Sequence, residues 1–330
     1  MKLLTVTQLR RVTVISMSEK PVVIIVGSAH MDFTVYVDHL PKTGETVIGE
    51  KFLMSPGGKG ANQAVAVARL GAKSYLISRV GTDYIGEQLV QNLVRNSVDT
   101  TYVTRDPTTY TGVALIVVDR DGRNIIAVAP GTDLKVSKED VDRAEEIIKR
   151  ASIMLLQLEI PVETVVYAAR KAHSYGVKVI LNPAPARKLP SEIYKYIHTI
   201  TPNVVEAETL SGVKIETRDD MIKAARKLQD LGVKNVVITL GEEGALLVTE
   251  EEVKHVPTFK VTAVDTTGAG DAFNGALAVA LAEGKTIDEA VLIANAAAAL
   301  KCTKPGAQTG LPWREELRSF IKERIGRELI

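Results

Sequence analysis

The sequence predicts an α/β fold, in which a mostly parallel central β-sheet carries helices on both faces as a three-layer sandwich with a small β-sheet lid. From residue 21 onward, short β-branched runs alternate with longer helical patterns, an order typical of parallel sheets. Two stretches, 31–54 and 109–130, break this rhythm and alternate as antiparallel strands do. We therefore expect these two stretches to form the lid over one edge of the parallel sheet.

The strand-like runs are short and apolar, and the first of them, VVIIVG at 22–27, ends on a glycine. Similar runs occur at 74–81, 152–159, 177–185 and 233–241. Helical patterns lie between the runs at 61–72, 138–150, 162–174 and 219–231, and the C-terminal third is mostly helical over 268–283, 286–301 and 313–326. In the lid stretch 109–130, Asp121-Gly122 predicts a hairpin turn.

Composition limits the possible functions. The chain has 330 residues, of which 45% are hydrophobic, enough for the core of one large domain. The net charge of +1 provides no field that would attract nucleic acid or an anionic membrane. The single cysteine, Cys302, cannot form an intrachain disulfide, which favours a reducing compartment and hence the cytoplasm.

We predict one domain over residues 21–330. Residues 1–20 are expected to be a loose N-terminal extension, in which Met17 is an alternative start, because Arg10 and Arg11 interrupt any apolar core of a signal peptide. No run approaches the roughly 18 apolar residues that a membrane span needs.

The strongest motif is VDTTGAGDAF at 264–273. Gly268-Ala269-Gly270 form a turn that opens directly into a helix, and the free N–H groups of such a turn stabilise an anion. Asp271 follows in the first helical turn, where it can accept a proton beside that anion, the pairing that phosphoryl transfer needs. An Asp that only caps the helix would fit this motif as well. A dinucleotide-binding loop would not, because the next glycine comes too late.

A second glycine-rich motif, SPGGKGANQA at 55–64, precedes the first long helix. Gly57 and Gly58 let the backbone pass close to a ligand, while Lys59 and Asn62 could grip adjacent hydroxyl groups. The motif lacks the pattern of a Walker A loop. An ordinary strand-to-helix turn is the alternative.

Other candidate residues lie where parallel strands should end. Asn203 and Glu206 can share one face at a strand-to-helix junction, where they suit a hydrated Mg²⁺ on a nucleotide or merely cap a helix. Asp32 and Glu159 are placed to accept paired hydrogen bonds from a sugar diol. Thr239 and Gly241 could lie beside the nucleotide. The five histidines show no metal-ligand spacing.

Together, in this order, the motifs resemble the ribokinase/PfkB family of carbohydrate kinases. The resemblance runs from about Val22 to the C-terminal helix. GGKGANQA (57–64) looks like the first signature of the family and DTTGAGDAF (265–273) like the second, and LNPAPAR (181–187), TPN with Glu206, and PGAQTGLPWREEL (305–317) are similar to ribokinases within it.

The resemblance implies a ribokinase-like fold and a kinase that transfers the γ-phosphoryl group of Mg-ATP to the primary 5-hydroxyl of D-ribose, giving ribose 5-phosphate. Asp271 would be the base, and Gly268, Ala269 and Gly270 the anion hole. It also implies a lid that pairs with that of a second subunit, hence a homodimer. The residues that would contact the sugar are His30, Asp32, Gly57, Gly58, Lys59, Asn62, Glu159 and Asp271.

For the nucleotide, the resemblance implies contacts from Asn203, Glu206, Thr239, Gly241, Gly244, Gly270 and Asn295. It further implies an activating K⁺ beside the anion hole, bound mostly through backbone carbonyls of Asp265, Thr267, Lys301, Lys304, Gly306 and Gly310.

The sequence departs from the family pattern at His30, where asparagine is common, and at Gly310, where serine is usual. The first departure leaves the sugar open, so that a nucleoside kinase or another small-sugar kinase is the closest alternative. A sugar-phosphate substrate would need basic residues, and 31–54 contains only Lys42 and Lys51. A non-catalytic sugar sensor on the same fold would have lost the base, but Asp271 is present.

Overall fold

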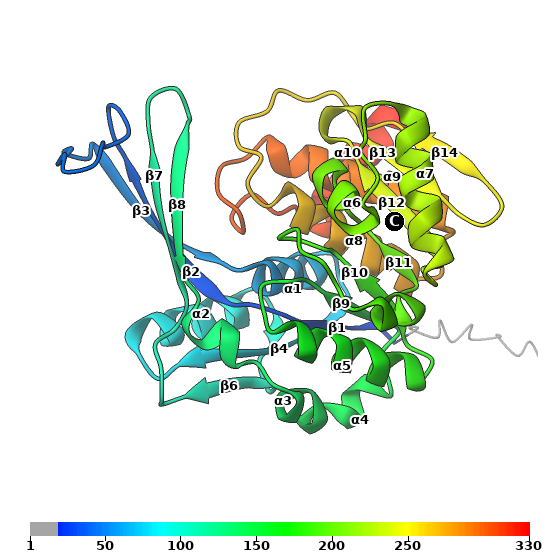
Figure 1. The fold of residues 1–330 in the computed structure, drawn as a ribbon, viewed down its shortest axis with the longest axis horizontal. Coiled ribbons are helices and arrows are strands. Elements are labelled where there is room, and N and C mark those ends of the chain that lie inside the picture. Colours follow the sequence, from blue (N-terminus) through cyan, green and yellow to red (C-terminus); the bar gives the residue numbers. More distant parts are fainter. Residues whose placement is uncertain (1–18) are drawn as a thin grey trace, which may run out of the picture.

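The computed structural model describes residues 19–330, so that almost all of the predicted N-terminal extension (1–20) lies outside the described residues. The described chain forms a large central sheet covered by helices, and a smaller four-stranded sheet that stands off one side of it (Figure 1). Both sheets were expected, and the predicted α/β architecture is confirmed. No helix of residues 19–330 has the length and apolar character that crossing a membrane requires.

In the central sheet the strands follow the order β14-β13-β12-β11-β10-β9-β1-β4-β5, with β6 paired to β4. Those from β12 to β5 run parallel, whereas β13 and β14 form an antiparallel edge. The bounds are β1 Val22–Val26, β4 Lys73–Gly81, β5 Val98–Asp99, β6 Val103–Asp106, β9 Ile153–Leu156, β10 Lys178–Leu181, β11 Thr199–Ile200, β12 Asn235–Thr239, β13 Ala245–Val248 and β14 Val253–Val256.

The central strand β1 explains why the predicted strands are apolar throughout. Side chains alternate between the two faces of a strand, and both faces of this sheet are covered. Val23 and Ile25 belong to one hydrophobic core, and Val22, Ile24 and Val26 to the other. Each run of apolar residues thus joins two cores, one on each side of the sheet.

Helices from different parts of the chain fill the two outer layers. The layer that contains Val23 and Ile25 is covered by α1 Lys59–Arg69, α2 Tyr84–Arg95, α8 Ala269–Ala282, α9 Ile287–Cys302 and α10 Arg314–Ile325. The opposite layer is covered by α3 Lys138–Arg143, α4 Glu145–Ile148, α5 Val162–Ser174, α6 Val204–Ser211 and α7 Arg218–Asp230.

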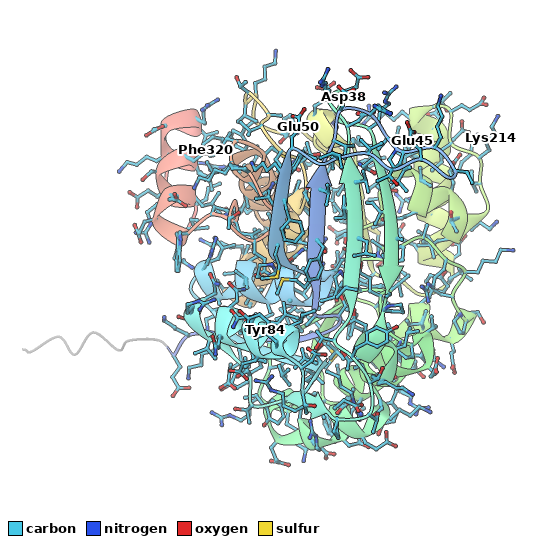
Figure 2. The ribbon with its side chains drawn as sticks, turned by 90° about the vertical axis from the view of Figure 1, so that its left-hand side faces the viewer. Asp38, Glu45, Glu50, Tyr84, Lys214 and Phe320 are labelled. Carbon is cyan, nitrogen blue, oxygen red and sulfur yellow. The ribbon has the colours of Figure 1, made fainter. Side chains whose placement is uncertain are left out.

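The lid is the sheet β3-β2-β7-β8, made of β2 His30–Tyr36, β3 Lys51–Gly57, β7 Val113–Val118 and β8 Asn124–Ala129. Figure 2 views its strands side by side, with Glu45 and Glu50 near its outer end. The hairpin of β7 and β8 turns at Gly122, which has a positive φ of 78°, as predicted. Not all lid strands are antiparallel, however, because β2 pairs with β7 in parallel.

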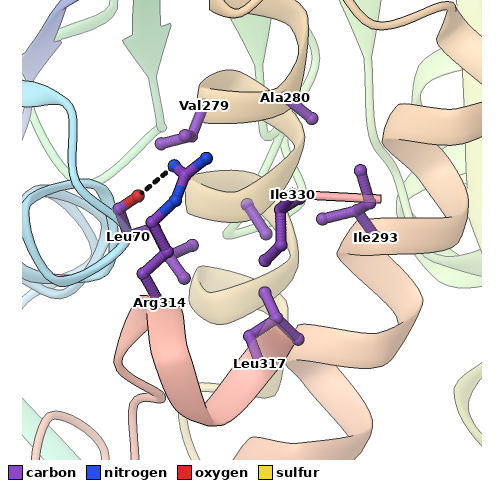
Figure 3. Close-up of a pocket in the computed structure, with 8 residues that line it drawn as sticks. Leu70, Val279, Ala280, Ile293, Arg314, Leu317 and Ile330 are labelled. Atoms are coloured by element: carbon purple, nitrogen blue, oxygen red, sulfur yellow. Dashed lines mark hydrogen bonds between the residues drawn. The ribbon is translucent and has the colours of Figure 1, made fainter. Parts of the chain in front are cut away.

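The C-terminal helix α10 closes the layer over α8 and α9 (Figure 3). Arg314 donates one hydrogen bond to the carbonyl of Leu70 at 2.8 Å and pairs with Glu283 at 2.6 Å. Leu317 and Ile330 line the small hollow beside it with other apolar side chains. This hollow is part of the packed interior and presents no convergent polar groups, so we assign it no ligand.

Several elements differ from the predictions. The expected helix 138–150 is broken into α3 and α4, because Ala144 ends one helix and begins the next. The predictions omitted α2 and the short strands β5, β6, β11, β13 and β14. Two-residue strands such as β11 carry too little periodicity to be found from sequence.

Candidate active site

The chain reverses its direction of progress across the sheet at β1. Later strands are added on one side up to β5 and then, starting with β9, on the other side. Ligands of open α/β sheets bind at such a point, beyond the carboxyl ends of the strands. The segment after β1 contains Ser28 and His30, and the segment after β9 contains Glu159.

Asp271 lies at this point, in the first turn of α8, where it is buried. Its two carboxylate oxygens accept hydrogen bonds from the side-chain amides of Asn62 at 2.8 Å and Gln63 at 3.0 Å, both in α1. Burial raises the pKa of Asp271, opposed by the positive charge of Lys59. The carboxylate is therefore held in place, and its affinity for a proton is increased.

The turn before Asp271 has the geometry of an anion site, with one correction to the prediction. Gly268 adopts the left-handed conformation, with φ 81°, in which a side chain would be strained. The N–H of Ala269 donates to the carbonyl of Thr266 at 3.1 Å and is not available to a ligand. Within residues 19–330, the N–H groups of Gly268 and Gly270 have no acceptor. Of the three backbone donors predicted for the anion hole, the structure therefore leaves two free to bind a ligand.

The glycine-rich motif at 55–64 lies close to the residues predicted to bind the sugar. A Cβ atom on Gly57 would lie 2.5 Å from the carboxylate of Asp32, and one on Gly58 would lie 2.9 Å from the carbonyl of Ser28. Gly58 also has a positive φ of 86°. Because no side chain fits at either position, the glycines allow β3 and the start of α1 to pack directly against the segment after β1.

Asp32 and His30 extend the site onto the lid strand β2. The ring of His30 is buried, with Nδ1 at 2.8 Å from Asp133 and Nε2 at 3.8 Å from Asp32. Burial would lower the pKa of His30, but Asp133 and the nearby carboxylates raise it to about 9. Burial raises the pKa of Asp32 to about 6. Burial also raises the pKa of Asp133, while its hydrogen bond with His30 acts in the opposite direction. Near neutral pH a protonated His30 ring thus lies between these two acidic side chains, and its nitrogens point at Asp133 and Asp32.

Glu159 links three parts of the chain: its own segment after β9, the segment after β1 and the start of α1. Its Oε2 accepts the hydroxyl of Ser28 at 2.5 Å and the backbone N–H of Lys59 at 2.9 Å. The negative charge of Asp271 raises the pKa of the Lys59 amine, with smaller contributions from Glu159, Glu206 and Asp32. Lys59 therefore stands as a cation among the carboxylates of the site. The structure brings together all of the predicted sugar-side residues.

On the other side of the site, Asn203 and Glu206 form a complete capping box at the start of α6. The side-chain carbonyl of Asn203 accepts the N–H of Glu206 at 2.8 Å, and the carboxylate of Glu206 accepts the N–H of Asn203 at 2.9 Å. Burial raises the pKa of Glu206, while Lys59 acts in the opposite direction. The helix cap is therefore present in the structure. The carboxylate of Glu206 that completes it is buried and interacts with the positive charge of Lys59.

The other residues predicted to contact the nucleotide differ in their surroundings. Thr239 ends β12 and pairs with Asn203 in a parallel bridge. A Cβ on Gly241, in the 3₁₀ turn that follows, would meet nothing within 4 Å, whereas one on Gly244 would lie 2.3 Å from the carbonyl of Val256. Asn295 is buried in α9, and its amide donates to backbone carbonyls of 256–257. Gly244 and Asn295 thus hold strand β14 and the segment after it.

The predicted K⁺ site does not fit the structure. The buried ammonium group of Lys301 donates to the carbonyls of Asp265 at 2.7 Å and of Lys304 at 3.4 Å, which were expected to bind the ion. The carboxylate of Asp265 accepts the N–H groups of Thr267 at 2.9 Å and Gly306 at 2.7 Å. Burial opposes ionisation of Asp265, but these hydrogen bonds lower its pKa. The ammonium group of Lys301 thus occupies the position at which the sequence predicted K⁺.

Sequence reasoning missed several residues of the site. Gln63 lies within the motif at 55–64 and Ser28 lies two positions before His30, so these recognised neighbours were the available signal. Gln308 donates to the side-chain carbonyl of Asn62 at 2.9 Å and so contacts the residue that holds Asp271. Asp133 lies in a 3₁₀ turn after the lid, and nothing in its local sequence indicates the partnership with His30.

With this geometry established, comparison with known proteins gives the family. The model of the pfkB family of carbohydrate kinases matches residues 20–314. The chain belongs to this family. Among curated relatives, the ribokinase of Haemophilus influenzae is 41% identical over 298 residues, covering 90% of this chain and 97% of the relative. The deoxyribokinase of Salmonella typhimurium is 39% identical over 298 residues, with the same coverage of both chains.

Solved structures agree with the fold. The ribokinase of Thermotoga maritima has a TM-score of 0.85 and 43% identity, covering 92% of this chain and 99% of that one. The Arabidopsis thaliana ribokinase, solved with ribose and ATP, also has a TM-score of 0.85, with 34% identity and the same coverage. This member of the family is a ribokinase-type sugar kinase, a phosphotransferase with an alcohol group as acceptor.

Proposed function

We propose that this kinase phosphorylates the primary 5-hydroxyl of D-ribose with ATP, giving ribose 5-phosphate. The observation that carries the proposal is the position of Asp271, a buried carboxylate with a raised pKa directly beside the free N–H groups of Gly268 and Gly270. A proton acceptor and an anion site lie next to each other, which is the arrangement that phosphoryl transfer requires.

In this mechanism Asp271 takes the proton of the attacking hydroxyl. The amides of Asn62 and Gln63 each occupy part of one carboxylate oxygen and leave lone pairs for the substrate. As the oxygen of the hydroxyl bonds to the γ-phosphorus, the bond from that phosphorus to the β–γ bridging oxygen breaks and ADP leaves. The N–H groups of Gly268 and Gly270 stabilise the negative charge on the transferred group by hydrogen bonding. Lys59 adds a positive charge beside the same region.

We assign the binding of the ring hydroxyls to Asp32, Glu159 and the backbone at Gly57 and Gly58. The two carboxylates can each accept paired hydrogen bonds from a diol. His30, expected to touch the sugar, is proposed instead to orient Asp32, because its nitrogens already face Asp133 and Asp32. Ribose is favoured because the chain resembles ribokinases over nine tenths of its length, and one such relative was solved with ribose and ATP.

The nucleotide is proposed to lie along Asn203, Glu206, Thr239 and Gly241, with its Mg²⁺ near Glu206. A buried carboxylate and an amide suit a hydrated Mg²⁺, which keeps several waters and is shared with phosphates. Within residues 19–330 no group of three acidic, histidine or cysteine side chains forms a metal cage, so the phosphates would supply much of the coordination. Mg²⁺, when bound, neutralises charge on the β- and γ-phosphates.

We further propose that two copies pair through the lid. Phe52, Met54, Leu115 and Ile125 lie on one face of the lid sheet by register, and each is 45–58% exposed. Such an apolar face is typical of a protein–protein contact. Leu115→Lys should reduce the mass measured by light scattering from twice 35.7 kDa to 35.7 kDa. A wild-type protein of 35.7 kDa would contradict the pairing.

The substrate is tested by a phosphoryl-transfer screen with ribose, deoxyribose, fructose, adenosine and cytidine. We expect ribose to give the highest kcat/KM with ATP. Deoxyribose is the first competitor, because a deoxyribokinase is 39% identical to this chain. A nucleoside that exceeds ribose tenfold, or about 1.4 kcal/mol, would favour the nucleoside-kinase alternative. A cytoplasmic location is also proposed, from the lone cysteine.

A further inference from the structure

The side chain of Lys301 runs from the last turn of α9 into the protein and is fully buried. Its ammonium group lies 2.7 Å from the carbonyl of Asp265, 3.4 Å from that of Lys304 and 3.9 Å from the Asp265 carboxylate. Lysine is almost never fully buried unless it is paired, because an isolated charge is costly in the interior. Two carbonyls and one carboxylate provide this pairing.

The same ligand set would otherwise suit a large monovalent cation, since neutral carbonyl oxygens and one carboxylate match a hard ion of single charge. A second cation could not share these oxygens, because unit charges about 4 Å apart repel each other strongly away from water. Lys301 and a bound K⁺ are therefore mutually exclusive at this place.

Gly310 makes room for the lysine. A Cβ atom at position 310 would lie 3.0 Å from Cε of Lys301, 2.9 Å from the carbonyl of Gly306 and 3.0 Å from that of Lys304. A side chain at 310 would thus collide with the buried lysine stem and the surrounding carbonyls. The lysine at 301 and the glycine at 310 form a matched pair, although they are nine positions apart.

The Lys301 site is linked to the proposed chemistry by two short routes. In the first, Asp265 holds the N–H groups of Thr267 and Gly306, and so ties the turn before the anion hole to the loop 303–310. The close packing of this loop against Gly268 belongs to the same route, because a Cβ there would lie 3.1 Å from the carbonyl of Ala307.

The second route runs through side chains. Gln308 donates to Asn62 at 2.9 Å, and Asn62 donates to Asp271 at 2.8 Å. A change in the position of the loop 303–310 would therefore reach both the anion hole and the carboxylate of the base.

We propose that the ammonium group of Lys301 serves as a built-in monovalent cation, which fixes the turn 265–270 and makes this kinase independent of K⁺. The role of the turn in holding the transferred phosphoryl group rests on the proposed function. Lys301 itself is a positioning residue, since its contacts are to backbone carbonyls and not to the reacting atoms.

The first test needs no variant. Turnover of the wild type is measured with K⁺ replaced by tetramethylammonium at constant ionic strength, and kcat should change less than about twofold, because no activating ion is lost. A severalfold activation by K⁺ would overturn the proposal.

The second test removes the ammonium group. Lys301→Ala leaves the Asp265 and Lys304 carbonyls without their donor and opens space for an ion. We expect its kcat in tetramethylammonium to fall on the order of tenfold, with K⁺ or NH₄⁺ restoring most of it and Li⁺ little. Lys254→Ala, which removes a surface lysine paired with Asp288 at the start of the same helix, is the matched control and should keep its kcat in every salt. Full activity of Lys301→Ala without K⁺ would contradict the proposal.

The third measurement does not depend on any substrate. A ligand that binds only the folded state raises the melting temperature. K⁺ at constant ionic strength should raise the Tm of Lys301→Ala relative to tetramethylammonium and leave that of the wild type unchanged. Equal responses of the two proteins would refute the built-in cation even if ribose proved to be the wrong substrate, whereas failure of the substrate screen alone would leave this result intact.

Discussion

The two halves of the proposed active site, one assigned to the sugar and one to the nucleotide, are built differently. On the sugar side, side chains far apart in sequence bond directly to one another: Asn62 to Asp271, and Ser28 to Glu159. On the nucleotide side, Asn203 and Glu206 bond mainly to each other within one turn. A Cβ atom would find open space at Gly241 and at Gly270.

This difference indicates that the side chains on the sugar side are already positioned before a ligand binds. The proposed base and the carboxylates assigned to the sugar are held by long-range contacts, which would reduce the reorganisation that the reaction needs. The nucleotide side offers backbone and open space, and its geometry is completed by the ligand. Substitutions on the sugar side should therefore change kcat strongly, and those on the nucleotide side should change mainly the KM for ATP.

The largest effect is expected for Asp271→Asn. The substitution keeps the shape of the side chain and removes its ability to take a proton, so kcat should fall about 10²–10⁴-fold. Binding of ATP and sugar, measured by calorimetry, should stay largely intact because the carboxylate contributes little to ground-state affinity. Asp288→Asn, at the start of α9, is a control that should leave kcat unchanged. Near-normal kcat in purified Asp271→Asn would remove Asp271 from the mechanism.

Gln63→Met is expected to come next. The change removes the hydrogen bond to Oδ1 of Asp271 while retaining a side chain of similar length. A hydrogen bond to a charged group is worth about 1.5–3 kcal/mol, so kcat should fall at least about tenfold. The KM for ATP should stay within about twofold if the two halves act separately. An equal rise in both KM values with unchanged kcat would show that Gln63 supports the fold and not the base.

The same contrast explains what the sequence could predict. Glycine-rich motifs with a local mechanism, such as the turn before Asp271, and apolar strands such as β1 could be recognised from residue types and spacing. The partnership of His30 with Asp133 could not, because 103 positions separate the two. The sequence predicted K⁺ among carbonyls of Asp265 and the loop 301–310, whereas the structure shows the ammonium group of Lys301 at two of these carbonyls. Only the three-dimensional structure shows that Gly310 lets the stem of Lys301 reach those oxygens.

A smaller effect concerns pH. Because burial raises the pKa of Asp32 to about 6, its carboxylate is mostly ionised at pH 7 and mostly protonated at pH 5. The ionised form accepts hydrogen bonds from the sugar, so kcat/KM for sugar should fall about tenfold from pH 7 to pH 5. His30, with a pKa of about 9, stays protonated over this range and contributes no step. In Asp32→Asn, kcat/KM for sugar should be lower at pH 7 and lose this step. A step that persists in Asp32→Asn would assign the titration to another group.

The smallest effect should come from Glu206→Gln. Glutamine also completes a capping box, so α6 should keep its start and Tm should change little. The variant loses only the charge proposed to lie near Mg²⁺, and because that contact runs through water and is shared with phosphates, the loss should be about 1 kcal/mol, or about fivefold in the KM for ATP. Raising the Mg²⁺ concentration should recover part of this loss, and the KM for sugar should not change. A change in the KM for sugar as large as that for ATP would mean that the two halves of the site are coupled, and would break the comparison drawn between them.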